Sequence, residues 1–169
     1  MKLLRLSYRL RGDSLIEVAI ALGVVAILLT ITTISITTSL GNAQESKNRN
    51  QATAYAQQAI EVTRQMRDTS WTSFSSLNNA TYCMADTCTQ VSNTAGSCGP
   101  KVGSSCGKNV GNFSREVSLT TTASCPTVST TQVDNIKVTV KVAWESTACI
   151  SSGNPFCKAV TLESCLSNF

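Results

Sequence analysis

The sequence predicts an α+β protein in which a long N-terminal helix, membrane-spanning in its first half, packs on a small antiparallel β-sheet held by disulfides. Three observations predict this fold. An apolar run extends from Leu15 to Leu40, a helix-favouring segment without proline or glycine follows between Glu45 and Asp68, and strand-like alternation begins beyond Trp71. All eight cysteines lie in this last part of the chain. A helix followed by an antiparallel sheet with one solvated face is an α+β arrangement.

The first twelve residues form a short basic segment. They contain four of the 14 Lys+Arg and no acidic residue, which leaves 10 basic against 10 acidic residues in the rest of the chain. The net charge of +4 therefore describes the N-terminus, and we expect no basic nucleic-acid-binding face. Because cations precede the apolar run and none directly follows it, the N-terminus is predicted to lie in the cytoplasm and the rest of the chain outside.

The apolar run from Leu15 to Leu40 is long enough to cross the roughly 30 Å hydrocarbon core of a bilayer as a helix. A secretory signal peptide would have a shorter core, whereas an uncleaved signal anchor would have the same length and flanks. Glu17 lies inside the run, where an unpaired ionised side chain costs roughly 2.5–3.5 kcal/mol. Either Glu17 closes a capping box with Ser14 in the first helical turn, or it has a function that requires a partner.

Gly12 followed by Asp-Ser-Leu-Ile-Glu-Val resembles the leader junction of type IV pilins and pseudopilins. The resemblance implies cleavage between Gly12 and Asp13 by a membrane prepilin peptidase, and it places Glu17 at the fifth mature position. In this family that glutamate neutralises the new N-terminal amine, here on Asp13, of a neighbouring subunit. The family's first mature residue, usually phenylalanine or methionine, is also N-methylated. Ile34 stands where major pilins often have proline, which favours a minor pilin or pseudopilin.

The helix is predicted to continue beyond the membrane through Ser39–Asn42. Residues 51–71 look like the helix end of minor pilins. A stripe of mostly small residues repeats there at helical spacing, and we expect it to pack against the chain's own globular part: Ala52, Ala56, Ala59, Thr63 and Met66, with Ile60 beside it. Surface pairs at i,i+4 are expected between Glu45 and Arg49 and between Arg64 and Asp68. The predicted organisation is a leader at 1–12, a transmembrane or filament-core helix at 13–40, an extracytoplasmic continuation at 41–70 and a cysteine-rich β-sheet domain at 71–169.

Three strands are predicted in the globular part, after a glycine-rich loop at 92–112. The first is Phe113–Thr121, with Phe113, Val117 and Leu119 on one face and Arg115 interrupting the alternation. The second, Val133–Trp144, alternates most clearly, with five apolar side chains on one face. The third contains Val160, Leu162 and Leu166. Their order resembles that of minor-pilin sheets.

The eight cysteines are predicted to form four disulfides. They are Cys83, Cys88, Cys98, Cys106, Cys125, Cys149, Cys157 and Cys165. An even number on the outer side of a membrane segment indicates an oxidising compartment. The alternative is zinc, which would need thiolate-only sites because the chain has no histidine and no C-x-x-C pair. Eight cysteines allow 105 connectivities, of which the sequence suggests only a bridge across the loop between Cys149 and Cys157.

No catalytic constellation is found, and we expect neither an enzyme nor a cofactor or metal. The expected function is that of a structural subunit of a type IV pilus-like filament. Its expected partners are other pilin subunits, the prepilin peptidase, the assembly machinery and, before assembly, the inner-membrane bilayer; no nucleic acid is indicated. One alternative is an uncleaved, membrane-anchored surface binding or adhesion module. The other is a membrane-tethered zinc or redox domain. Adhesion, motility, DNA uptake and secretion remain open as the filament's purpose.

Overall fold

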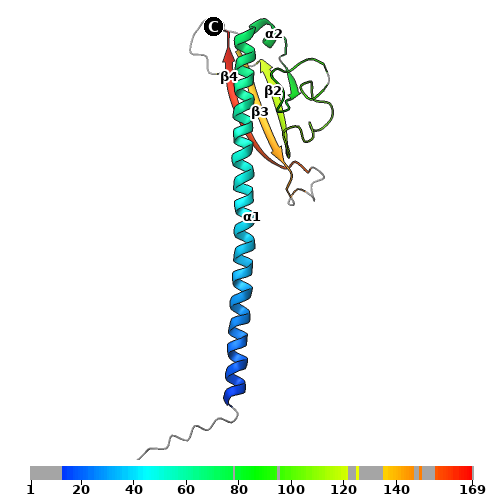
Figure 1. Cartoon of the computed structure of the whole chain (residues 1–169). Helices are drawn as coiled ribbons and strands as arrows, with labels where there is room; N and C mark the ends of the chain where they lie inside the picture. Colours follow the sequence, from blue (N-terminus) through cyan, green and yellow to red (C-terminus); the bar gives the residue numbers. More distant parts are fainter. Residues whose placement is uncertain are drawn as a thin grey trace, which may run out of the picture. The chain divides into compact units, whose positions relative to one another are not determined.

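The computed structural model describes residues 13–77, 79–94, 96–121, 125, 135–146, 149 and 155–168. Expectations for residues 1–12, including Gly12, lie outside this part of the chain. The chain divides into two compact units, Met1–Glu45 and Ser46–Phe169. The described elements, coloured along the chain in Figure 1, are α1 (Asp13–Thr69), α2 (Trp71–Ser75), β1 (Ala80–Cys83), β2 (Phe113–Thr121), β3 (Asn135–Trp144) and β4 (Lys158–Ser167).

Helix α1 is continuous through Ser39–Asn42, as the sequence predicts. It contains no proline. Its two glycines have open space around the position of a Cβ, so their effect on α1 is limited to the low helix propensity of glycine. The helix ends at Thr69, and Ser70 then caps α2, its hydroxyl accepting a hydrogen bond from the backbone N–H of Ser73 at 3.3 Å. The expected Arg64–Asp68 pair is wrong: Arg64 contacts Glu61, and Asp68 contacts Arg67.

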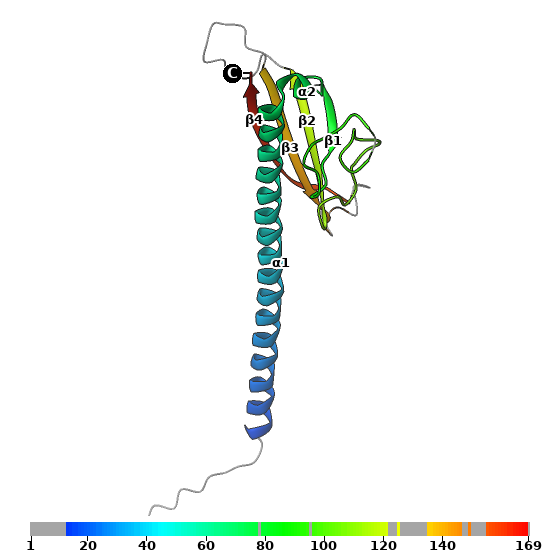
Figure 2. The ribbon, with the colours of Figure 1, turned by 45° about the horizontal axis from the view of Figure 1, so that its top comes forward.

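The four strands form one antiparallel sheet in the order β1-β2-β3-β4 (Figure 2). Strand β2 has the predicted bounds, and β4 contains the third predicted run. Strand β3 begins at Asn135, and the first two residues of its predicted span, 133 and 134, lie outside the described residues. Neither β1 nor α2 is predicted from the sequence. The register pairs Val117 with Val140 and Val140 with Leu162, so the apolar residues of three strands share one face.

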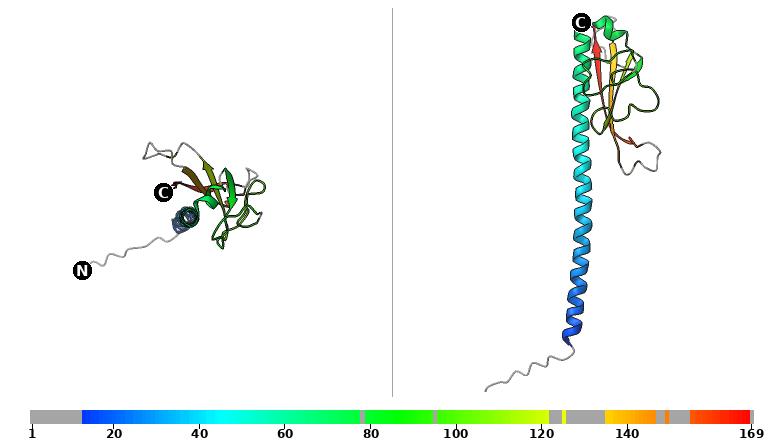
Figure 3. Two further views of the ribbon diagram at one scale, coloured as in Figure 1. Left: turned by 90° about the horizontal axis from the view of Figure 1, so that it is seen from above. Right: turned by 45° about the vertical axis from the view of Figure 1, so that its right-hand side comes forward.

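The hydrophobic core lies between this face of the sheet and the last third of α1. Ala52, Ala56, Ala59 and Thr63 are buried, and the three alanines belong to the same apolar cluster as the sheet's inward side chains. Figure 3 shows the strands lying against one side of the end of α1. Small side chains let the helix backbone approach the sheet closely, which leaves room for the valines and leucines of β2 and β3. The expectation that the stripe packs on the chain's own domain is confirmed.

Candidate functional site

The apolar part of α1 exposes its side chains on all faces. Every large aliphatic residue from Leu15 to Leu40 is at least 51% exposed, and Leu15 reaches 81%. Elsewhere in the described chain, only Val102 is an exposed large hydrophobic residue. A helix that is apolar all round belongs in a membrane or among other apolar helices. By length and composition this helix can cross a bilayer, although a signal sequence near an N-terminus would meet the same criterion.

The outer half of the apolar run carries many hydroxyl side chains. Six of them donate hydrogen bonds to helix carbonyls three or four residues earlier: Thr30, Thr32, Thr33, Ser35, Thr37 and Thr38. The hydroxyl hydrogens are therefore satisfied within the helix itself. Since an unsatisfied polar group costs several kcal/mol in hydrocarbon, this local bonding makes the segment compatible with an apolar environment.

Glu17 is the acidic residue within this apolar surface. Its side chain is exposed and makes no hydrogen bond or ion pair with any residue that the structure describes. Asp13 is the first residue of α1, one helical turn before Glu17. The side chains of Asp13 and Ser14 lie outside the described part, as does Gly12, so neither the capping box nor the predicted charge pair is described. In an apolar environment, the Glu17 carboxylate would need a positive partner.

All eight cysteines are paired in disulfides, and no cysteine is free. The bonds are Cys83–Cys106, Cys88–Cys98, Cys125–Cys165 and Cys149–Cys157. They form two nested sets, because the second bond closes inside the loop of the first and the fourth inside the loop of the third. The predicted Cys149–Cys157 bridge is confirmed. A thiolate-only zinc site needs free thiols, and none remains when all eight cysteines are paired. The redox alternative stays a prediction, because a redox-active pair can itself be a disulfide.

Arg115 is the buried residue that sequence reasoning missed. It was expected to interrupt the β2 alternation, but its side chain points into the core and is only 1% exposed. The guanidinium donates to the carbonyl oxygens of Met84 and Ala85, at 2.8 and 2.6 Å. Its Nη1 donates to the carbonyl of Tyr55 at 3.2 Å and to Oε1 of Gln58 at 3.0 Å. Burial lowers the pKa of Arg115, an effect that the nearby charge of Asp86 partly opposes.

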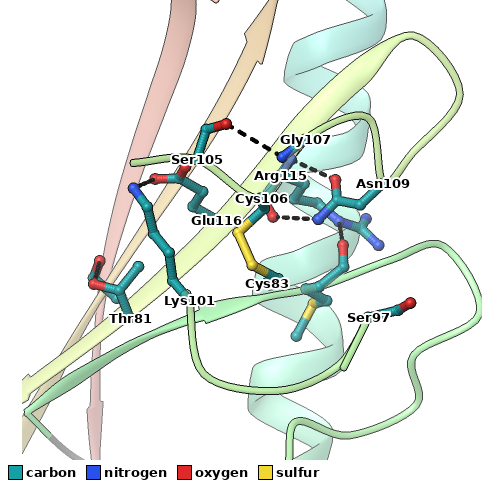
Figure 4. The surroundings of a disulfide bond; sticks show 12 residues. Thr81, Cys83, Ser97, Lys101, Ser105, Cys106, Gly107, Asn109, Arg115 and Glu116 are labelled. Carbon is teal, nitrogen blue, oxygen red and sulfur yellow. Dashed lines mark hydrogen bonds and ion pairs between the residues drawn. A yellow bond between two sulfur atoms is a disulfide. The ribbon is translucent and has the colours of Figure 1, made fainter. Parts of the chain in front are cut away.

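The backbone of Arg115 is held as firmly as its side chain (Figure 4). Its N–H donates to Oδ1 of Asn109 at 2.7 Å, and Nδ2 of Asn109 donates back to the Arg115 carbonyl at 2.9 Å. The Cys83–Cys106 bond lies beside this pair, as does an ion pair between Lys101 and Glu116 at 2.9 Å. Together these contacts hold the irregular segment between β1 and β2 against the sheet. The burial of Arg115 could have been predicted from the alternation of β2, because this alternation places residue 115 on the same face as Phe113 and Val117.

The chain matches no family model, no curated protein and no solved structure. The function of the chain is therefore inferred from its own geometry. That geometry combines an apolar helix suited to a non-aqueous environment, an acidic residue on its surface, and a disulfide-bonded domain suited to an oxidising one.

Proposed function

We propose that the chain is a structural subunit, of the minor pilin or pseudopilin type, of a type IV pilus-like filament. The observation that carries the proposal is Glu17, an acidic residue on an apolar helix surface just after the Gly12–Asp13 junction. The resemblance of this junction to prepilin leaders supplies the biological context. Before assembly the helix lies in the inner membrane, with the N-terminus in the cytoplasm and the globular domain outside. After assembly it lies among the helices of other subunits.

The physical argument concerns charge in an apolar environment. Cleavage after Gly12 creates a positive amine on Asp13, which is the partner that the carboxylate of Glu17 needs. If the amine of one copy meets Glu17 of the next, two costly charges are neutralised together only at one axial offset. The pair would therefore set the register between subunits, while the exposed aliphatic side chains provide the contact area.

The proposed cleavage and assembly imply a set of partners. A prepilin peptidase would cut the leader, membrane-bound assembly machinery would move the subunit, and other pilin subunits would cover the apolar helix. Four disulfides support delivery of the globular domain to an oxidising compartment, since such bonds rarely persist in the cytosol. This function requires no catalytic step.

The alternative is an uncleaved single-pass protein whose disulfide-bonded domain binds a surface ligand. One observation favours it. The residue after the proposed cleavage site is Asp13, where the resembling family usually has phenylalanine or methionine. A carboxylate beside the new amine would itself partly neutralise that amine and weaken the demand for Glu17.

The N-terminal residue of the protein, purified from its native cells, distinguishes the two. We expect the mature chain to begin at Asp13 and to gain eight hydrogens on reduction, measured by intact mass and N-terminal sequencing. Replacement of Gly12 by valine should leave the chain starting at Met1. Gly41→Ala, a glycine change in the open part of α1, is the matched control and should be cleaved normally. A wild-type chain that keeps Met1 would overturn the filament proposal in favour of the anchored module.

A further inference from the structure

A polar cleft lies in the unit Ser46–Phe169, between the end of α1 with α2 on one side and residues 89–93 on the other. Its volume is about 550 Å³, within the roughly 300–1,000 Å³ typical of small-molecule sites. Of the thirteen described residues that line it, nine are polar and uncharged, four are apolar, and none carries a charge. The filament proposal gives this cleft no role.

The second wall of the cleft is held in place before any ligand binds. The Cys88–Cys98 disulfide closes the loop that contains residues 89–93. Within this loop, the N–H of Ser92 donates to the carbonyl of Cys98 at 2.8 Å. The side chain of Val91 is buried in the hydrophobic core. A loop fixed in this way loses little conformational entropy when a ligand binds, which favours affinity.

Some hydrogen-bonding groups of the cleft remain available, whereas the hydroxyls of Thr69, Ser70 and Ser76 already donate within the chain. The hydroxyl of Tyr82 lies 3.0 Å from the carbonyl oxygen of Leu77 and 3.1 Å from Oδ1 of Asn93, and it has one hydrogen to donate to these two acceptors. The Nδ2 hydrogens of Asn93 make no hydrogen bond with another described residue. Burial raises the pKa of the Tyr82 hydroxyl. The side chains of Gln65, Thr89 and Gln90 make no hydrogen bonds with other described residues. Each amide offers both a donor and an acceptor.

The composition of the lining selects the class of ligand. A phosphate, carboxylate or ammonium group would find no opposite charge among the described lining residues, and its desolvation would go uncompensated. Paired donors and acceptors, with apolar contacts from side chains such as Met66, suit a molecule that has many hydroxyls and apolar C–H faces. We propose that this cleft binds a neutral saccharide. The site would serve equally on a filament or on an anchored domain, so it does not depend on cleavage after Gly12.

The test uses the full-length, oxidised protein in lipid nanodiscs, because maltoside detergents carry a disaccharide headgroup that would compete. Saturation-transfer NMR is recorded with lactose, cellobiose and N,N′-diacetylchitobiose as neutral probes. Sialyllactose, which adds a carboxylate to lactose, serves as the charged counterpart, and an uncharged Gly-Ser peptide as a probe of another class. We expect a signal from at least one neutral saccharide. No signal from any of the three would overturn the proposal.

The location is tested with a double variant, Gln65→Ala with Gln90→Ala. Removing two uncharged hydrogen-bonding groups should lower the affinity for the saccharide about tenfold. Gln57→Ala changes an exposed glutamine of the same helix outside the cleft and should bind as the wild type does. Equal binding by all three proteins would overturn the assignment of the site. Stronger binding of sialyllactose than of lactose, or of the peptide than of any saccharide, would overturn the proposed ligand class.

Discussion

Arg115 brings a guanidinium into the hydrophobic core, where an ionised group is costly unless its hydrogen bonds are satisfied. The surrounding main chain satisfies it with three carbonyl oxygens, and Gln58 adds an amide oxygen. The acceptors belong to α1 and to the segment after β1, so one side chain joins three parts of the domain. The planar fork of arginine suits several fixed acceptors, whereas the compact ammonium of lysine does not.

Replacement of Arg115 by alanine should therefore destabilise the domain by about 3–5 kcal/mol, because buried carbonyls lose their donors and a cavity forms. Arg115→Lys should retain part of that stability. The matched control is Arg64→Ala, which removes an exposed ion pair with Glu61 worth at most about 1 kcal/mol. Denaturant unfolding of the oxidised chain, followed by near-ultraviolet circular dichroism, measures all three. A loss from Arg115→Ala no greater than that from Arg64→Ala would contradict this account.

At the scale of elements, the sequence predicts the segments that have strong periodicity. Strands β2 and β3 alternate over nine and ten residues, and α1 has an apolar run followed by a clear small-residue stripe. Strand β1 has only four residues and α2 only five, too few for a period to emerge. Their positions depend on tertiary contacts, such as the pairing of Tyr82 with Val117 across the sheet. The cleft was equally hidden, since it forms only when the loop at 89–93 folds back beside the end of α1 and α2.

The outer face of β3 and β4 carries an ion pair between Lys137 and Glu163 at 2.9 Å. The hydrogen bond from Lys137 lowers the pKa of Glu163 below its usual value. Folding thus favours the ionised carboxylate. Its contribution to stability is present above the pKa of an unfolded glutamate, about 4.3, and is lost as the pH falls through the lower folded value. Because Glu163 is exposed, the effect on overall stability is small.

The pKa of Glu163 can be measured directly by carbon-13 NMR of its carboxyl group. Lys137→Met should raise that pKa towards the ordinary range, since the main stabilising donor is gone. Lys141→Met serves as the control, because Lys141 lies as far along β3 from Thr139, the residue opposite Glu163, as Lys137 does, but makes no ion pair with Glu163 in the described chain. An unchanged Glu163 pKa in the Lys137 variant would show that the ion pair is absent in solution.

For the whole molecule, the disulfides compensate for a small core. Only 5% of the residues are aromatic, whereas each disulfide typically contributes roughly 2–4 kcal/mol by restricting the unfolded chain. The number of bonds could be predicted from eight cysteines on one side of an apolar segment. The nested connectivity could not, because it depends on how loops return to the sheet. Cys83 at the end of β1, for example, meets Cys106 only once the intervening segment has folded back.

The proposed assembly makes a prediction for the whole molecule at Glu17. Glu17→Ala removes the carboxylate, so the new amine of a neighbouring Asp13 would enter the apolar filament core unpaired. An unpaired buried charge costs about 3–5 kcal/mol, which corresponds to a loss of incorporation of more than about 100-fold. Insertion into the membrane should not suffer, because the helix becomes more apolar, and cleavage after Gly12 should continue.

The measurement is the fraction of the chain in filaments sheared from cells, compared with the fraction in membranes. Glu61→Ala is the matched control, since it removes an exposed carboxylate of α1 that pairs with Arg64 within the same chain. We expect the control to enter filaments as the wild type does and the Glu17 variant to accumulate, cleaved, in the membrane. If the Glu17 variant entered filaments at the wild-type level, subunit register would have to come from the apolar contacts alone. If it remained uncleaved, Glu17 would instead act in recognition by the peptidase.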